Sequence, residues 1–234
     1  MKLLALDSTT DACSAALYLD GAICEHFEVA PRRHTALLLP MAHQLLMDAG
    51  VRLAELDYLA FTQGPGSFTG LRIAVGAVQG LALGLDRPVI GISTLAALAA
   101  RAHRQHGASR VAVAMDARMG QVYWGQYELD DAGDLIRQVP DQLMKPGQVQ
   151  PLPPGEWQAV GAGWLRYKDV LEAASGLRIG SMTVEQYPHA EDVARLAVER
   201  ARLGEGVAAP LAQPVYLREQ VAEKPGAGMP TRHN

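Results

Sequence analysis

The sequence predicts a mixed α/β fold that is built twice along the chain. Strand-like apolar runs alternate with helix-like segments, which is typical of parallel strands joined by crossover helices. Each half begins with a strand that ends in an aspartate, followed by a second strand after a turn. Because this pattern recurs about a hundred residues later, it indicates a duplicated domain rather than a solenoid. We therefore expect two domains, residues 1–107 and 108–222, and a disordered tail over 223–234.

The first half opens with a buried strand that ends at Asp7 and with a hairpin turned at Asp20-Gly21, a dipeptide that favours tight hairpins. The next expected elements are a helix over residues 34–50, a strand over 56–63 and a loop over 64–70. They are followed by a helix over 71–85, a strand over 87–93 and a helix over 94–107. Gly50 and Gly107 are the expected ends of the first and last of these helices.

The second half starts in the same way, with a strand that ends at Asp116. Residues 138–157 contain five prolines and are expected to form a connector. A short strand and a glycine turn then lead into a helix through Tyr167 and Leu171. Residues 189–204 form an amphipathic helix, with acidic residues in its first turn where they favour the helix dipole.

Composition limits the function. The apolar run over residues 73–85 is too short to span a bilayer, and Asp7 interrupts the N-terminus too early for a signal peptide, so we expect a cytoplasmic protein without membrane contact. In the expected hairpin the sulfurs of Cys13 and Cys24 lie about 13 Å apart, which predicts two buried thiols rather than a disulfide. A net charge of −4 argues against binding nucleic acid without partners.

The strand-end turns and one glycine-rich loop are the candidate ligand site. The loop GPGSFTG, residues 64–70, joins a strand to a helix, where backbone amides can bind an anion, although capping by Ser67 or Thr69 explains it equally well. Asp7 and Asp116 resemble the phosphate-loop aspartates of actin-like ATPases and sugar kinases, but the turn after Asp7 lacks the glycines that let phosphate approach the backbone. The candidate vestigial nucleotide site comprises Asp7, Ser8, Thr9, Gly64, Gly66, Ser67 and Asp116.

Four segments resemble the bacterial TsaB (YeaZ) family: LALDSTTDACSAAL, GPGSFTGLRIAVGAVQGLA, DARMGQVY and PVYLRE. The resemblance runs from the first strand to about Ala222 and implies a duplicated actin-like (ASKHA, ribonuclease-H-like) fold of two domains. It also implies a part in forming N6-threonylcarbamoyladenosine on tRNA, as a non-catalytic partner of a TsaD-like catalytic subunit, together with a TsaE-like ATPase. Contact with tRNA is then expected only through the complex.

The resemblance also implies that no metal or cofactor is held. TsaD-like proteins carry a His-x-x-x-His pair on the helix that follows the strand after the glycine-rich helix. The matching positions here are Thr94 and Leu98, a poor metal ligand and a side chain that cannot ligate at all. The histidines show no HExxH motif either, and we interpret them as solvated or capping side chains.

The partner surface is expected on the two N-terminal helices. Apolar residues of the helix over 34–50 cover more than the stripe of roughly 100° that packing on one sheet requires. Gly76, Gly80 and Gly84 share one face of the next helix and together cost roughly 3 kcal/mol of helix propensity, so a close neighbour is expected. That neighbour is either the domain itself or a second chain, and the family resemblance favours the second chain. The candidate interface residues are Leu37, Leu38, Met41, Leu45, Arg72, Gly76, Gly80 and Gly84, which would also serve a homodimer of the isolated chain.

Two alternatives stay open at this point. An active actin-like kinase or ATPase would use Asp7 and Asp116 with magnesium. A metallopeptidase is less favoured because the ligand positions are occupied by Thr94 and Leu98.

Overall fold

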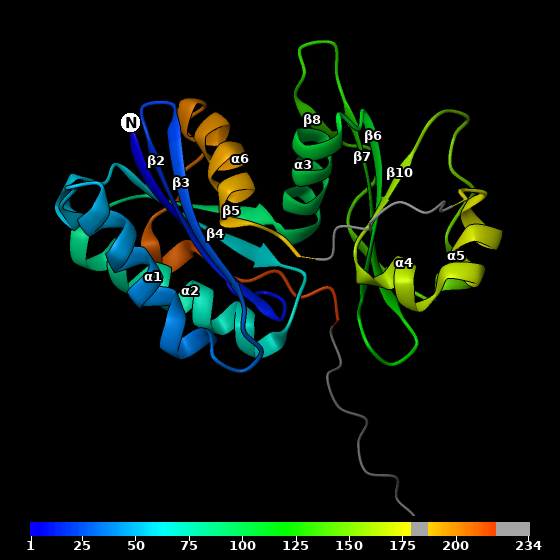
Figure 1. Cartoon of the computed structure of the whole chain (residues 1–234), viewed down its shortest axis with the longest axis horizontal. Coiled ribbons are helices and arrows are strands. Elements are labelled where there is room, and N and C mark those ends of the chain that lie inside the picture. The colour runs from blue at the N-terminus through cyan, green and yellow to red at the C-terminus, as the bar shows by residue number, and fades with distance from the viewer. Residues whose placement is uncertain (179–186, 219–234) are drawn as a thin grey trace, which may run out of the picture.

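The computed structural model describes residues 1–178 and 187–218 and shows two lobes, each built on a mixed sheet (Figure 1). The sheet of the first lobe has the order β3-β2-β1-β4-β5. Its strands are β1 (Lys2–Asp7), β2 (Ala12–Leu19), β3 (Ala22–Val29), β4 (Tyr58–Gly64) and β5 (Val89–Ser93). β1 runs antiparallel to β2 and parallel to β4.

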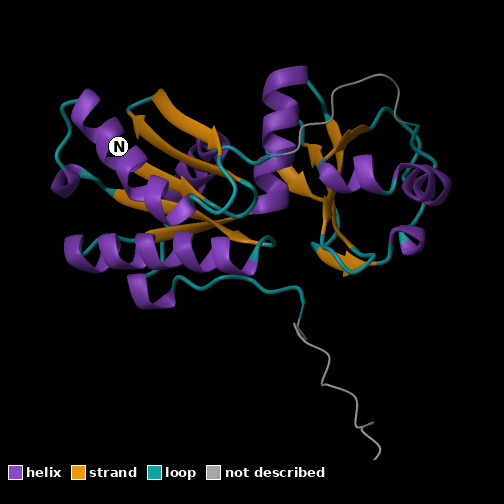
Figure 2. Ribbon diagram, turned by 60° about the horizontal axis from the view of Figure 1, so that its bottom comes forward, coloured by secondary structure: helices purple, strands orange, loops and turns teal. Residues whose placement is uncertain are grey.

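Helices cover both faces of this first sheet (Figure 2). Helices α1 (His34–Asp48) and α2 (Phe68–Leu85) pack on the face that carries Leu4 and Leu6. Helices α3 (Thr94–His106) and α6 (Ala190–Arg202) pack on the opposite face, against Leu3 and Ala5. The core of the lobe therefore forms two layers, one on either side of the sheet.

The second sheet repeats the same arrangement on a smaller scale. Its order is β10-β6-β7-β8, and β9 pairs with β7. Its strands are β6 (Arg110–Asp116), β7 (Val122–Leu129), β8 (Leu135–Arg137), β9 (Gln142–Met144) and β10 (Gln158–Val160). The helices of this lobe are α4 (Ala162–Arg166) and α5 (Lys168–Ser175). The pairing of β6 with antiparallel β7 and parallel β10 matches the pairing of β1 with β2 and β4. The predicted duplicated, actin-like α/β fold is confirmed.

The structure confirms the predicted register of the hairpin and corrects the predicted burial of one cysteine. The turn at Asp20-Gly21 pairs Leu17 with Cys24, while Cys13 lies opposite Glu28 further along the ladder, so the two cysteines are far from one another. Cys13 is buried in the core as predicted, but Cys24 is exposed, because β3 is an edge strand whose outward positions face solvent.

The predicted assignment of residues 108–222 to the second domain is corrected, because the last described residues pack on the first lobe. Helix α6 belongs by sequence to the second half, yet it packs on the first sheet, and Val207 forms a bridge with Val89 beside β5. Residues 187–218 therefore complete the first lobe, and the second lobe is shorter than residues 108–222. Residues 219–222 and the predicted tail over 223–234 lie outside the described residues.

Two further differences concern α2 and the proline-rich connector. Helix α2 starts three residues earlier than expected, at Phe68, and by length and composition it is the one described helix that could cross a membrane. It packs on the first sheet through Ala74, Val75 and Val78, as core helices of this composition do. The connector over 138–157 contains strand β9, which the sequence pattern missed.

Candidate functional site

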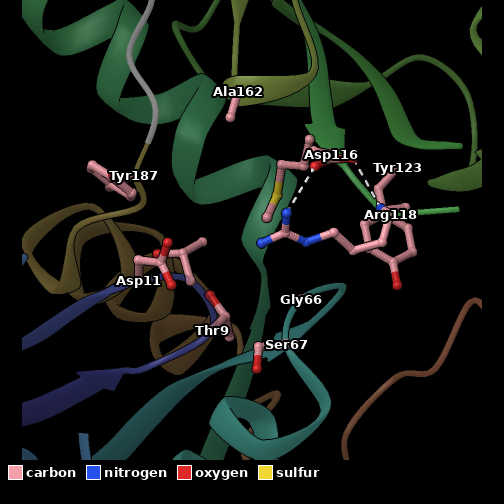
Figure 3. A pocket seen from close by; sticks show the side chains of 12 residues that line it. Thr9, Asp11, Gly66, Ser67, Asp116, Arg118, Tyr123, Ala162 and Tyr187 are labelled. Carbon is pink, nitrogen blue, oxygen red and sulfur yellow. Dashed lines mark hydrogen bonds and ion pairs between the residues drawn. The ribbon is translucent and has the colours of Figure 1, made fainter. Parts of the chain in front are cut away.

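A cleft of about 450 Å³ opens between the lobes where strands of both sheets end (Figure 3). From the first lobe it is lined by Thr9, Thr10 and Asp11, which follow β1, and by Gly66 and Ser67, which precede α2. From the second lobe it is lined by Met115, Asp116, Ala117, Arg118, Tyr123 and Ala162, and Tyr187 lies at its edge. Arg118 and Tyr123 lie in the quoted segment DARMGQVY but were not predicted as site residues, and Tyr187 lies outside all four quoted segments.

The glycine-rich loop is locked against the turn that follows β1. A Cβ atom added at Gly70 would lie 1.9 Å from the carbonyl oxygen of Ser8, and one added at Gly66 would lie 2.6 Å from that of Thr9. The Ser8 hydroxyl donates a hydrogen bond of 2.8 Å to the carbonyl of Gly70. Close backbone approach inside the lobe thus explains two glycines of the motif without a ligand.

Capping explains a further part of this loop. The Ser67 side chain accepts a hydrogen bond from the Gly70 amide at the first turn of α2, as the sequence predicted. Gly64 has a φ of +117°, and a Cβ atom there would lie 2.6 Å from the carbonyl oxygen of Val215. Gly64 therefore accommodates the segment that follows α6, and it does not line the cleft.

Asp7 is fully buried and does not line the cleft. Its Oδ1 accepts hydrogen bonds from the Thr62 hydroxyl, the Thr9 hydroxyl (2.7 Å) and the Thr9 amide (3.2 Å). Its Oδ2 has no hydrogen-bond partner among the described residues. Burial raises the pKa of the Asp7 carboxyl, and the hydrogen bonds from Thr62 and Thr9 oppose that shift in part. Asp7 and the neighbouring Ser8, also buried, are thus corrected from cleft residues to residues of the lobe interior.

Asp116 faces the cleft, but its charge is already compensated. Arg118 and Arg166 place guanidinium nitrogens 3.5 and 3.4 Å from its Oδ2. Its Oδ1 accepts hydrogen bonds from the Arg118 amide (2.9 Å) and the Tyr167 hydroxyl (3.3 Å). The cleft therefore unites Thr9, Gly66, Ser67 and Asp116 of the predicted site. A magnesium ion held by Asp7 and Asp116 does not fit this arrangement, because one carboxylate is enclosed and the other is paired with two cations.

We expect the stability of Asp7→Asn relative to the natural protein to rise between pH 4 and pH 8, because the natural carboxyl loses its contribution to folding as it ionises. The pKa of the Asp7 carboxyl is higher in the folded than in the unfolded protein, so its protonated form stabilises the fold. This stabilisation is complete at pH values below the unfolded-state pKa, and it is lost as the pH rises through the folded-state pKa. Asparagine keeps an acceptor for Thr9 and Thr62 but cannot ionise. Urea unfolding at several pH values between 4 and 8 should show the difference in unfolding free energy, variant minus natural protein, increasing with pH. The exposed control Asp48→Asn should change stability by less than about 0.5 kcal/mol at each pH. A difference in unfolding free energy that stayed constant or fell as pH rose would contradict this account.

Thr94 and Leu98, the two positions that the resemblance predicted to match a metal-binding histidine pair, are both fully buried. Leu98 is buried between α3 and the second sheet, and Thr94 is buried with no hydrogen-bond partner for its hydroxyl among the described residues. Across residues 1–178 and 187–218, no group of three or more His, Cys, Asp and Glu side chains is placed to hold a metal ion.

The outer face of α1 and α2 is open to solvent. Gly76, Gly80 and Gly84 are exposed, and a Cβ atom added at any of them would meet nothing within 4 Å. Four large apolar side chains are exposed on the same two helices: Phe68 at the start of α2, and Leu39, Met47 and Leu83, the last of them at 72%. The glycine stripe therefore does not pack inside its own lobe.

The other predicted interface residues differ in how far they are exposed to solvent. Leu38 and Leu45 are only 1% and 3% exposed because they point from α1 into the core against the sheet, so their assignment to a partner surface is corrected. Leu37 and Met41 are partly buried at the margin of that core. Arg72 is exposed near the start of α2, where its guanidinium lies 4.0 Å from the centroid of the Phe68 ring.

Comparison with known proteins places these features in context. Residues 26–224 match the profile of the family described as TsaD, tRNA N6-adenosine threonylcarbamoyltransferase. The chain is 44% identical to the tRNA threonylcarbamoyladenosine biosynthesis protein TsaB of Escherichia coli K12, covering 96% of this chain and 97% of that protein. It is 37% identical to TsaB of Haemophilus influenzae, covering 96% of both chains. Among solved structures it is similar to YeaZ from Pseudomonas aeruginosa, with a TM-score of 0.86, 46% identity, and coverage of 92% of this chain and 99% of that one.

Proposed function

Because the chain belongs to the TsaB (YeaZ) family of tRNA threonylcarbamoyladenosine biosynthesis proteins, we propose that it is a non-catalytic subunit that binds a TsaD-like catalytic subunit. The proposed contact is the outer face of α1 and α2. On this proposal the chain supports threonylcarbamoyl transfer to tRNA by holding the catalytic subunit, and it does not perform the chemistry itself.

The open glycine stripe of α2 is the observation that carries this proposal. A stripe of exposed glycine lowers the helix propensity and forms no contact within the lobe, so its use lies outside the lobe. A partner helix can approach glycine more closely than the usual 8–10 Å between helix axes. The exposed Leu39, Met47 and Leu83 supply apolar surface for the same contact.

Three features support the absence of catalysis in this subunit. Asp7 is enclosed, Asp116 is paired with two arginines, and the positions of the metal-binding histidines hold Thr94 and Leu98. A TsaE-like ATPase is proposed as the third component of the assembly. In isolation the same face of α1 and α2 would pair two copies of this chain, since a C2 dimer uses one self-complementary patch twice. A cytoplasmic location is part of the same proposal.

Co-expression with a TsaD-like protein tests the proposal directly. We expect a complex of defined stoichiometry in size-exclusion chromatography with light scattering, and transfer of threonylcarbamoyl to tRNA only when the TsaD-like subunit is present. Failure of the two proteins to associate at micromolar concentrations would refute the proposed role.

The isolated chain is expected to hydrolyse no ATP and to bind neither zinc nor iron. The reason is the enclosed and paired state of its two strand-end aspartates and the lack of ligands at residues 94 and 98. A phosphate-release assay and elemental analysis of the purified protein would measure both. Stoichiometric metal that disappears on replacing one named histidine would contradict this expectation.

A further inference from the structure

A patch of arginine, aromatic and methionine side chains lies beside the mouth of the interlobe cleft. It consists of Phe68, Arg72, Arg118, Met119, Tyr216 and Arg218, and we call it the rim patch. We propose that the rim patch contacts unpaired nucleotides of the RNA substrate, an inference that rests on the proposed function and names a surface for it.

The rim patch is assembled from three distant parts of the sequence. Tyr216 lies against Phe68 with ring centroids 5.7 Å apart, and the Arg72 guanidinium covers the Phe68 ring and approaches the Tyr216 hydroxyl. Arg218 reaches from the first lobe to the second, where it donates hydrogen bonds to the carbonyl of Ala117 (3.1 Å) and to the sulfur of Met119. A cavity of about 250 Å³ lies between these groups, with Tyr123 in its wall.

The charge of the rim patch favours an anionic ligand. Arg72 and Arg218 have only neutral partners among the described residues, in contrast to arginines such as Arg195 and Arg202, which are paired with glutamates. Arg118 shares Asp116 with Arg166, so that group of three also keeps a net positive charge. Figure 3 shows Arg118 and Tyr123 on the wall of the cleft that faces Thr9 and Ser67. The patch is therefore locally basic on a chain whose net charge is −4.

Exposed rings beside unneutralised arginines are the chemistry of single-stranded nucleic-acid binding. Bases stack on aromatic side chains with little sequence preference, and arginines contact the phosphates. Phe68 and Tyr216 are each 42% exposed and Met119 is 67% exposed, so their apolar surfaces are available. A stable protein interface uses about 20–30 residues on each side, far more than these six side chains around one cavity. The small concave patch fits one or two unpaired nucleotides better than a protein surface.

The test is a crosslinking and binding experiment with the full chain, alone and in complex with the TsaD-like subunit. The probe is a fluorescein-labelled RNA stem-loop whose unpaired loop carries 4-thiouridine, with a fully paired RNA of equal length as the comparison. We expect weak, salt-dependent binding of the stem-loop by the chain alone, in the range of about 10⁻⁴ to 10⁻⁶ M. Irradiation should crosslink the loop to the peptide that holds Phe68 or to the one that holds Tyr216.

Matched variants separate stacking from charge. Tyr216→Ala should weaken stem-loop binding about tenfold, whereas Tyr216→Phe should retain it. Arg72→Ala and Arg218→Ala should each lower the slope of log affinity against log salt by about 1. The control Arg195→Ala, on α6 and paired with Glu191, should leave the affinity for RNA unchanged.

The outcomes distinguish this inference from the proposed function. Equal binding of paired and unpaired RNA, or no effect of the Tyr216 and Arg72 variants, would overturn the RNA contact while assembly with the TsaD-like subunit could persist. Loss of the TsaD-like subunit by these variants, with RNA binding intact, would overturn it in favour of a protein contact. Circular dichroism melts of each variant verify that the protein remains folded.

Discussion

Replacing Gly70 with alanine should destabilise the protein by about 3 kcal/mol or more, a larger loss than the usual effect of overpacking. The added Cβ would lie 1.9 Å from the backbone carbonyl oxygen of Ser8, and no rotation of a side chain can relieve this contact. The start of α2 would have to move away from the turn after β1, which would break the hydrogen bond from Ser8 to Gly70.

The same substitution further along α2 provides the matched control. Gly76→Ala meets no atom within 4 Å and improves helix propensity, so it should raise the free energy of unfolding by up to about 1 kcal/mol. Urea or thermal unfolding of both variants measures the contrast. Similar unfolding free energies for Gly70→Ala and Gly76→Ala would contradict the close approach of the Gly70 backbone to the Ser8 carbonyl.

Gly80→Leu should abolish binding of the TsaD-like subunit while leaving the isolated chain folded. Leucine fills the open groove, and a partner helix can then no longer approach the α2 backbone. We expect a loss of affinity of about 30-fold or more, the scale of a hot-spot residue. The melting temperature of the monomer should stay the same or rise, because leucine favours helix over glycine.

A pull-down measures the binding of the TsaD-like subunit, and a thermal melt measures separately whether the Gly80→Leu variant stays folded. Glu199→Leu is the control, since it adds a leucine at an exposed position of α6, and α6 packs on the opposite face of the first sheet from α1 and α2. The control should bind the TsaD-like subunit normally. If Gly80→Leu unfolded together with its loss of binding, the stripe would be internal packing and the proposed interface would fail.

Much of the fold could be predicted from local patterns. The Asp20-Gly21 turn set the hairpin register correctly, because a tight turn fixes which residues face one another. The strand-end positions of Asp7 and Asp116 indicated the duplication, which the two sheets confirm. Short strand β9 was missed because three residues in a proline-rich segment carry no period.

The site was predicted less completely, because side-chain direction depends on distant partners. The sequence places Asp7 at a strand end, but its orientation follows from Thr62, which lies 55 residues away. On α1, a count of apolar residues could not separate Leu38 and Leu45 in the core from exposed Leu39 and Met47. Arg166 and Tyr167 reach Asp116 from α4 and the residue after it, and no local motif indicates that contact.

The position of α6 has a consequence for synthesis and folding. The ribosome completes β5 at Ser93, but α6, which together with α3 covers the face of the first sheet that carries Leu3 and Ala5, begins only at Ala190. Until then the nascent chain leaves Leu3, Ala5 and Ala60 without the alanine and valine side chains of α6 that bury them. The first lobe therefore cannot finish folding before nearly the whole protein has been made, and the transiently open sheet face is where aggregation would start. The lobe that is translated first is completed by α6, the last α-helix of the described residues.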